Sequence, residues 1–375
     1  VNDLEQPWFL AVNFITPHDI MFDNMGEEHE ATMLNMVAAA ETELYQQEWD
    51  VTLPASFGEN SDEHPAGVAE FRRVNGRFQG CVPIENTKAW KRYINYYLNC
   101  YRDVDQHLGT VIDGLEAAGQ LDNTVIIFTS DHGDMGGAHN LREKGSILFR
   151  EVVNTPLIVS HPDGPDGQTT SAVGSALDLA PTILSLAGVT TAERKERHPQ
   201  LKGVDLSDVI LGHDQTGPRG NAESPGKGAL YTYDNLFTYD FGWFASHLNR
   251  LLSDAPVVQM EESNKPVITD PTKIFTELGA PDLNKRNMIR GIFDGRYKLI
   301  RYFSIGNYHL PADVDTLLKN NDVALYDLVI DPHEMVNLAR VDHPDYDKNL
   351  LATMNTKLND LIESEIGLDE NKVGI

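Results

Sequence analysis

The stretch from Thr124 to Pro156 reads TVIIFTSDHGDMGGAHNLREKGSILFREVVNTP, and it indicates the fold more clearly than any other part of the chain. Its first six residues are an apolar, β-branched run, which is typical of a strand buried on both faces. That predicted strand ends in SDHG at residues 130–133, so a carboxylate and an imidazole stand side by side where strand gives way to loop. Ligands of open α/β sheets bind at the carboxyl ends of strands, and Asp with His is a usable ligand pair for a divalent cation.

The composition sets limits on the kinds of partner. With 41% hydrophobic and 23% charged residues, the 375-residue chain has the make-up of a globular protein. A formal charge of −27 argues against nucleic acid or an anionic membrane surface as partner, because both would be repelled. An anionic substrate is still compatible, since a bound cation and Lys144, twelve residues beyond His132, can reverse the sign inside one pocket. No apolar stretch approaches the eighteen residues of a membrane-spanning helix.

The first part of the chain alternates between strand and helix patterns. An apolar run at 7–16 predicts a buried strand, and residues 49–85, with poor periodicity, predict a long surface excursion. Apolar residues at helical intervals over 88–118 predict one long amphipathic helix packed on a sheet. The helix-strand alternation continues through the strand at Leu157 and the helix at Asp178, which favours an α/β fold with a mainly parallel sheet flanked by helices.

The second part has a different character. Gly, Pro, Asn and Ser dominate residues 212–228, which predicts a boundary between a core domain at 1–212 and a C-terminal subdomain at 213–375. Strand patterns around 297–303 and 325–328 predict a small antiparallel sheet there, and the last helix is expected at 346–365. The subdomain is therefore expected to be α+β.

The order of strand, Ser-Asp-His-Gly, Gly-rich turn, lysine and second strand resembles the sulfatase family of the alkaline-phosphatase superfamily. Four more segments are similar to that family's motifs, and all five follow the family's order along the chain: Pro7–His18, Leu177–Gly188, Gly291–Tyr302 and Ala324–Ala339. The resemblance implies an alkaline-phosphatase/sulfatase-like α/β fold with a small C-terminal α+β subdomain.

The resemblance also implies a metal site. Asp131 and His132 match the family's cation ligands. Ca²⁺ is the family's usual ion, and members with His beside the Asp include Mn²⁺ users. Hard oxygen ligands favour Ca²⁺ and an imidazole suits Mn²⁺ better, so the sequence leaves both open.

Further residues match family groups that act on the leaving group of the reaction. Lys144 resembles the family lysine that contacts the sulfate oxygens and the leaving oxygen, and His18 resembles the histidine that protonates the departing alcohol. His139, Arg142 and Glu143 precede Lys144 in the Gly-rich loop and are candidates for lining the substrate pocket. A place on the loop surface is an equally good account of these three.

The family's nucleophile is not recognisable in these residues. Sulfatases open with a metal-binding strand and a Cys-x-Pro-Ser-x-Arg segment, whose Cys is oxidised to the nucleophilic formylglycine. Here the Pro-His strand comes within eighteen residues, and the near match at Cys81 continues as Val-Pro-Ile-Glu. We therefore expect the chain to be the C-terminal part of a sulfatase, completed by the N-terminal piece of the same precursor or by an oligomer partner, in the bacterial periplasm or outside the cell.

The function implied is metal-dependent hydrolysis of a sulfuric ester of a small molecule or carbohydrate. In that mechanism a formylglycine hydrate attacks sulfur, a cation neutralises the sulfate oxygens, and His18 and Lys144 assist the leaving group. Two alternatives stay open. One is a phosphodiester or phosphonate monoester hydrolase of the same superfamily, and the other is a non-catalytic remnant or interaction module.

Overall fold

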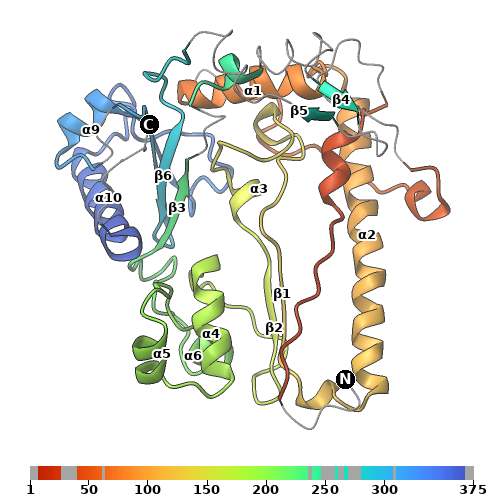
Figure 1. Ribbon diagram of the computed structural model, residues 1–375. Coiled ribbons are helices and arrows are strands. Elements are labelled where there is room, and N and C mark those ends of the chain that lie inside the picture. Colours follow the sequence, from red (N-terminus) through yellow and green to blue (C-terminus); the bar gives the residue numbers. More distant parts are fainter. Residues whose placement is uncertain are drawn as a thin grey trace. The chain divides into compact units, whose positions relative to one another are not determined.

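The chain forms two compact units. The computed structural model, whose helices and strands are labelled in Figure 1, describes residues 7–26, 40–60, 64–234, 239–245, 258–260, 266–268, 280–306 and 310–367. Unit 1 comprises Val1–Glu59, Gly76–Lys144 and Glu151–Gln168, and unit 2 comprises Asn60–Asn75, Gly145–Arg150 and Thr169–Ile375. The division after Gln168 lies ahead of the domain boundary predicted at residue 212, and that domain boundary stays a prediction. Within the described ranges, no helix combines the length and the apolar character needed to cross a membrane.

Unit 1 is organised on one long helix, α2 (Thr87–Ala117), which confirms the helix predicted at 88–118. The Asn86 side chain caps its start by accepting a hydrogen bond from the Ala89 amide at 3.2 Å. Trp90 and Tyr93 are buried on one face of α2 and pack against the buried Ile20 and Met25. The short 3₁₀ helices η1 (His18–Phe22) and η2 (Glu43–Gln46) contact the same helix.

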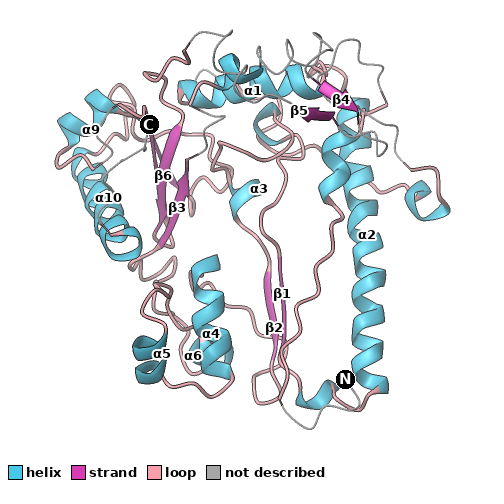
Figure 2. Ribbon diagram, in the orientation of Figure 1, coloured by secondary structure: helices cyan, strands magenta, loops and turns pink. Residues whose placement is uncertain are grey.

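The predicted 124–129 strand forms as β1 (Ile126–Thr129), after the 3₁₀ turn η4 (Leu121–Asn123), and it pairs with β2 (Leu157–Ser160). The pair is antiparallel, with Ile126 opposite Ser160. The expectation of mainly parallel pairing is thus wrong for the strands that the structure describes, which all pair in antiparallel fashion. Parallel neighbours need a crossover that carries the chain back along the sheet. Here the chain after β1 makes turns, η5 (Ala138–Asn140) and the four-residue α3 (Arg150–Val153), then runs back beside β1 (Figure 2).

The segment predicted as a buried strand at 7–16 is extended but forms no strand, and it is not buried. Phe9 is 74% exposed and Ile15 is 78% exposed. Phe14 stacks on His107 of α2, with ring centroids 6.1 Å apart. A strand requires a hydrogen-bonded neighbour, and none is present for this segment among the described residues.

The surface excursion predicted at 49–85 contains a helix, α1 (Ala66–Gln79), which begins in unit 2 and ends in unit 1. Its buried side chains include Val68, Phe71 and Val74, each three residues from the next. Phe71 stacks on Phe241 within unit 2, with centroids 6.3 Å apart. The helical period was present in the sequence, but the charged and polar residues between these positions obscured it.

Unit 2 contains a four-stranded antiparallel sheet in the order β3-β6-β7-β8. Helix α10 and the π-helical turn η8 pack on this sheet, where Leu351 and Leu358 meet Ile292, Leu299 and Leu325 in one core. The prediction of a small antiparallel sheet followed by a last helix is confirmed. The elements are β3 (Ala229–Tyr233), β6 (Met288–Phe293), β7 (Tyr297–Phe303), α9 (Val314–Asn320), β8 (Asp322–Asp327), α10 (Lys348–Leu361) and η8 (Ile362–Ile366).

Unit 2 also holds a group of short helices ahead of the sheet. Asp178 is the last residue of η6 and the N-cap of α4, and its buried carboxylate accepts a hydrogen bond from the Ser175 amide at 2.9 Å, which closes the capping box of η6. The remaining elements of the unit are η6 (Ala176–Asp178), α4 (Leu179–Leu186), α5 (Thr191–Arg197), α6 (Ser207–Ile210) and the hairpin of β4 (Val258–Met260) and β5 (Pro266–Ile268).

Candidate functional site

Asp131 and His132 lie just beyond β1, with Ser130 between, and their side chains approach each other. Asp131 Oδ2 lies 3.5 Å from His132 Nε2, and the Asp131 side chain is 86% exposed. His132 Nδ1 lies 3.0 Å from the carbonyl oxygen of Gly133. A carbonyl oxygen can only accept, so that contact favours the tautomer with the proton on Nδ1, and in the neutral ring Nε2 is then able to bind a cation.

This pair fits a divalent cation. Carboxylate oxygens and imidazole nitrogens bind such ions at roughly 2.0 to 2.6 Å, so two ligand atoms 3.5 Å apart can share one ion. The backbone hydrogen bond at Nδ1 orients the ring, as the outer partners of metal-binding histidines usually do. Two ligands do not fill the shell of either Ca²⁺ or Mn²⁺, so an ion here requires further ligands from protein or water.

Gly133 lets the loop after β1 approach α3 closely. Its amide donates to the Val152 carbonyl at 2.8 Å. A Cβ at this position would lie well inside van der Waals contact with the Glu151 carbonyl oxygen. The close approach, which requires glycine, fixes the backbone immediately beyond the Asp131-His132 pair.

The Gly-rich loop is built around Asp134, a residue for which the sequence suggested no role. Its buried carboxylate accepts hydrogen bonds from the amides of Gly136 at 2.8 Å and Glu143 at 3.1 Å, and from the Tyr93 hydroxyl of α2 at 3.1 Å. Burial is the main cause that raises the pKa of Asp134. The sequence feature that could have indicated this role is a second carboxylate, two residues after His132.

Lys144 follows this loop and lies beside η1, the helix that begins at His18. Lys144 Nζ is 3.9 Å from the sulfur of Met21 in η1 and 3.6 Å from Glu143 Oε2, and its side chain is 16% exposed. His18 is exposed at the first position of η1. The structure therefore brings Lys144 and the helix of His18 together, while the catalytic roles of both residues stay predictions.

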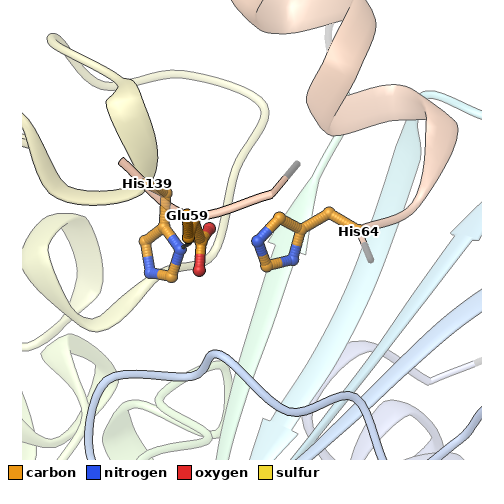
Figure 3. Close-up of side chains that lie close together, drawn as sticks. All are labelled: Glu59, His64 and His139. Carbon is orange, nitrogen blue, oxygen red and sulfur yellow. Dashed lines mark hydrogen bonds and ion pairs between the residues drawn. The ribbon is translucent and has the colours of Figure 1, made fainter. Parts of the chain in front are cut away.

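His139 and Arg142 are interior residues of unit 1. The His139 ring is fully buried, and its Nδ1 lies 2.5 Å from Glu59 Oε1 (Figure 3). Arg142 donates to the backbone carbonyls of Gln79 at 2.5 Å and Gly80 at 2.9 Å. Both side chains thus hold the loop to its surroundings, and their contact with substrate stays a prediction.

Glu143 is a second carboxyl of this loop with a raised pKa. Burial, followed by the neighbouring Asp134 carboxylate, raises the pKa of Glu143 to about 7, while Lys144 and Arg142 act in the opposite direction. The sequence suggested Glu143 only as a residue lining the pocket. Its approach to Lys144 could not be read from the sequence, because it depends on the loop conformation.

A cavity of about 400 Å³ lies elsewhere in unit 1 and includes none of the predicted site residues. It is lined by apolar and aromatic groups of α2 and β1, with Trp49, Arg102 and Asp105 at its wall. The predicted site residues therefore belong to the loop after β1 and to η1, and this cavity has no part in their arrangement.

Comparisons with known proteins agree with the motifs. The Sulfatase family matches residues 1–189. An N-acetylglucosamine-6-O-sulfatase of Bacteroides thetaiotaomicron is 34% identical over 152 residues, which are 40% of this chain and 25% of that protein. The solved structure of a 2-O GAG sulfatase has a TM-score of 0.60 at 19% identity, covering 94% of this chain and 58% of the other.

A phosphonate monoester hydrolase of Agrobacterium radiobacter has the same fold, with a TM-score of 0.53 at 20% identity over 97% of this chain and 57% of its own. The chain spans less than two thirds of the length of each of these proteins. The predicted alkaline-phosphatase/sulfatase-like fold class is confirmed by the solved structures. From the family match over half of its length, the chain belongs to the sulfatase family.

Proposed function

We propose that this chain forms part of a sulfuric ester hydrolase acting on a sulfate ester of a small molecule or carbohydrate. The observation that carries the proposal is the Asp131-His132 pair, with ligand atoms 3.5 Å apart at the end of β1, in a chain of the sulfatase family. The family relative named for N-acetylglucosamine 6-O-sulfate supports a sulfated sugar as the substrate class.

Asp131 and His132 would hold a divalent cation, for which we propose Ca²⁺, with Mn²⁺ as the alternative. Such an ion, when bound, supplies positive charge to the non-bridging oxygens of the ester. The chain's own groups would set the position of the ion. The Gly133 carbonyl orients the His132 ring, and the close contact of Gly133 with Glu151 fixes the backbone. The −27 charge of the chain would otherwise oppose binding of an anion.

Lys144 and His18 are proposed to act on the leaving group of the ester. The Lys144 ammonium would contact anionic ester oxygens, and the exposed His18 imidazole would give its proton to the departing alkoxide oxygen. The contact of Lys144 with Met21 supports this division, because η1 carries both Met21 and His18. His139 and Arg142 stay candidates for the pocket wall, which they would support from the interior.

The nucleophile is proposed to be a formylglycine on polypeptide outside these 375 residues. Cys81 is an exposed free thiol, but the residues after it read Val-Pro-Ile-Glu and lack the Ser of the modification motif. We see no other residue in the chain that matches the motif.

A polypeptide partner of the same precursor is proposed to cover exposed apolar side chains of unit 1. Phe9, Leu10 and Ile15 are exposed in the segment before η1, and Leu157 and Ile158 are exposed on β2. Exposed apolar side chains beside strand edges usually mark a surface that another chain covers. An oligomer partner is the alternative, and mass spectrometry of the purified complex distinguishes the two.

The function is tested on the complete gene product, produced in a host that generates formylglycine. Initial rates are measured with an aryl sulfate, sulfated amino sugars and an aryl phosphonate, together with metal content by elemental analysis. Turnover of a sulfate ester that is lost in Asp131→Asn supports the proposal. Preference for the phosphonate would favour the phosphorus-ester alternative, and binding of sulfated sugars without turnover would favour the non-catalytic one.

A further inference from the structure

We propose that Glu143 is a positioning residue for Lys144: its buried carboxylate holds the Lys144 ammonium in place, and protonation of that carboxylate weakens the hold. The inference rests on the proposed function for the meaning of Lys144, but the contact itself is a property of unit 1. Glu143 Oε2 lies 3.6 Å from Lys144 Nζ, with side chains 5% and 16% exposed.

The backbone places these two consecutive side chains together. In extended chain, neighbouring side chains point to opposite sides. Glu143 instead has φ of 77°, a left-handed conformation that is uncommon for residues other than glycine. Its amide donates to Asp134 Oδ2 at 3.1 Å, and its carbonyl accepts from the Met135 amide at 3.1 Å. Two hydrogen bonds on opposite sides of the residue therefore maintain a conformation that a glutamate would not adopt unaided.

Hydrogen bonds compensate the Glu143 carboxylate only in part. The Gln79 side chain hydrogen-bonds to the carboxyl, but Oε1 is buried and has no hydrogen-bond partner among the described residues. A buried carboxylate is unfavourable unless an opposite charge or donors compensate it. Arg142 is also nearby, but it donates to the Gln79 and Gly80 carbonyls. Lys144 is thus the cation that lies within ion-pair distance of the Glu143 carboxylate.

The attraction between the Glu143 carboxylate and the Lys144 ammonium is expected to change near neutral pH. Burial and the adjacent Asp134 carboxylate raise the pKa of Glu143 to about 7. Below that pH the carboxyl is neutral and attracts Lys144 less, and above it the ion pair forms. The titratable and charged groups that face Glu143 are Asp134, Arg142 and Lys144 of the same loop and Tyr93 of α2.

The first test measures the reactivity of Lys144 and needs no turnover. Trace amounts of an amine-acylating reagent are applied to the purified protein between pH 5.5 and 9, and the labelling of each lysine is read by mass spectrometry. Removing the adjacent negative charge favours the neutral, reactive amine, so Glu143→Gln should label Lys144 roughly threefold to tenfold faster at pH 8. Glu116→Gln, at an exposed position of α2, is the matched control and should change nothing.

Two further observations keep the proposal open to refutation. Glu143→Asp retains the charge on a shorter side chain and should label at a rate between those of the parent and Glu143→Gln. If Glu143→Gln does not fold, the parent protein alone provides the test, because its Lys144 labelling should change near pH 7, where the Glu143 carboxyl loses its proton. Equal Lys144 labelling in parent and folded Glu143→Gln at every pH would overturn the proposal.

The second test uses the complete enzyme. With Glu143 as a positioning residue, Glu143→Gln should lower kcat roughly tenfold to a hundredfold with KM little changed, and should remove the acid limb of the kcat profile near pH 7. A uniform fall in kcat at all pH values would indicate a structural role only and would contradict the inference. Altered labelling in a protein that hydrolyses no sulfate ester would instead leave the positioning intact and refute the proposed function.

Discussion

Replacing Asp178 with Asn should lower the free energy of unfolding by about 3 kcal/mol, because this carboxylate is the centre of a buried network in unit 2. Oδ1 accepts from Arg219 at 2.7 Å and from the Val204 amide at 2.8 Å, and Oδ2 accepts from Arg219 at 2.7 Å and from the Ser175 amide at 2.9 Å. Asp178 and Arg219 are both fully buried.

The magnitude follows from the donors. All four groups around the carboxylate are N–H donors, so either orientation of an asparagine amide places its own N–H groups against two of them. Breaking one partner of a buried ion pair typically costs about 3 to 5 kcal/mol. The lower end applies because Glu365 remains as a second partner of Arg219 at 2.8 Å.

The assay is urea unfolding followed by far-UV circular dichroism, with hydrogen exchange by mass spectrometry to locate the effect. Asp208→Asn is the matched control, since Asp208 lies in α6 of the same unit with a side chain 78% exposed. We expect the control to change stability by less than about 0.5 kcal/mol. A loss below about 1 kcal/mol for Asp178→Asn, or unchanged exchange in the peptides over 175–205, would refute the reasoning.

Three other predictions concern the loop after β1. Asp131→Ala should abolish binding of the divalent ion and turnover together, whereas Lys144→Ala should keep the ion, seen by elemental analysis, and lower the rate roughly a hundredfold. Gly133→Ala should destabilise unit 1 and weaken ion binding, because the added Cβ meets the Glu151 carbonyl oxygen; equal melting temperatures would contradict that clash. Burial raises the pKa of Glu143 from 4.5 to about 7, so its carboxyl favours the folded state least at high pH. The urea midpoint of Glu143→Gln relative to the parent should therefore rise between pH 5 and 8, and a constant difference would count against the shift.

Features that depend on local sequence were predictable. The helical spacing of the apolar residues over 88–118 was sufficient to predict α2, because a long amphipathic helix is specified by its own residues. Asp131 and His132 are adjacent in the chain, so their meeting required only that β1 end where its apolar run ends. The C-terminal sheet also followed from local strand patterns, which its antiparallel register confirms.

Features that depend on distant partners were not predictable. The apolar segment at 7–16 has the composition of a strand, but a strand forms only beside another, and here its side chains are exposed. The direction of β2 relative to β1 depends on how the intervening residues turn, which the strand patterns do not encode. The contact between Glu143 and Lys144 depends on a positive φ at a glutamate, and that conformation is set by hydrogen bonds to Asp134 and Met135.

Asp134 gives a physical reason why the two halves of the candidate site, the Asp131-His132 pair and Lys144, should keep a fixed separation. The proposed cation ligands precede it, Lys144 follows its loop, and the one carboxylate binds the amides of both Gly136 and Glu143. Tyr93 of α2 donates to the same carboxylate, so the loop is also tied to the longest helix of unit 1. Since a buried carboxylate is stable only with its donors in place, a displacement of Lys144 that carried Glu143 with it would break the Asp134 hydrogen bond to the Glu143 amide. The spacing of the Asp131-His132 pair from Lys144 is thus maintained from the interior, in a loop whose glycines and left-handed residues would otherwise permit many conformations.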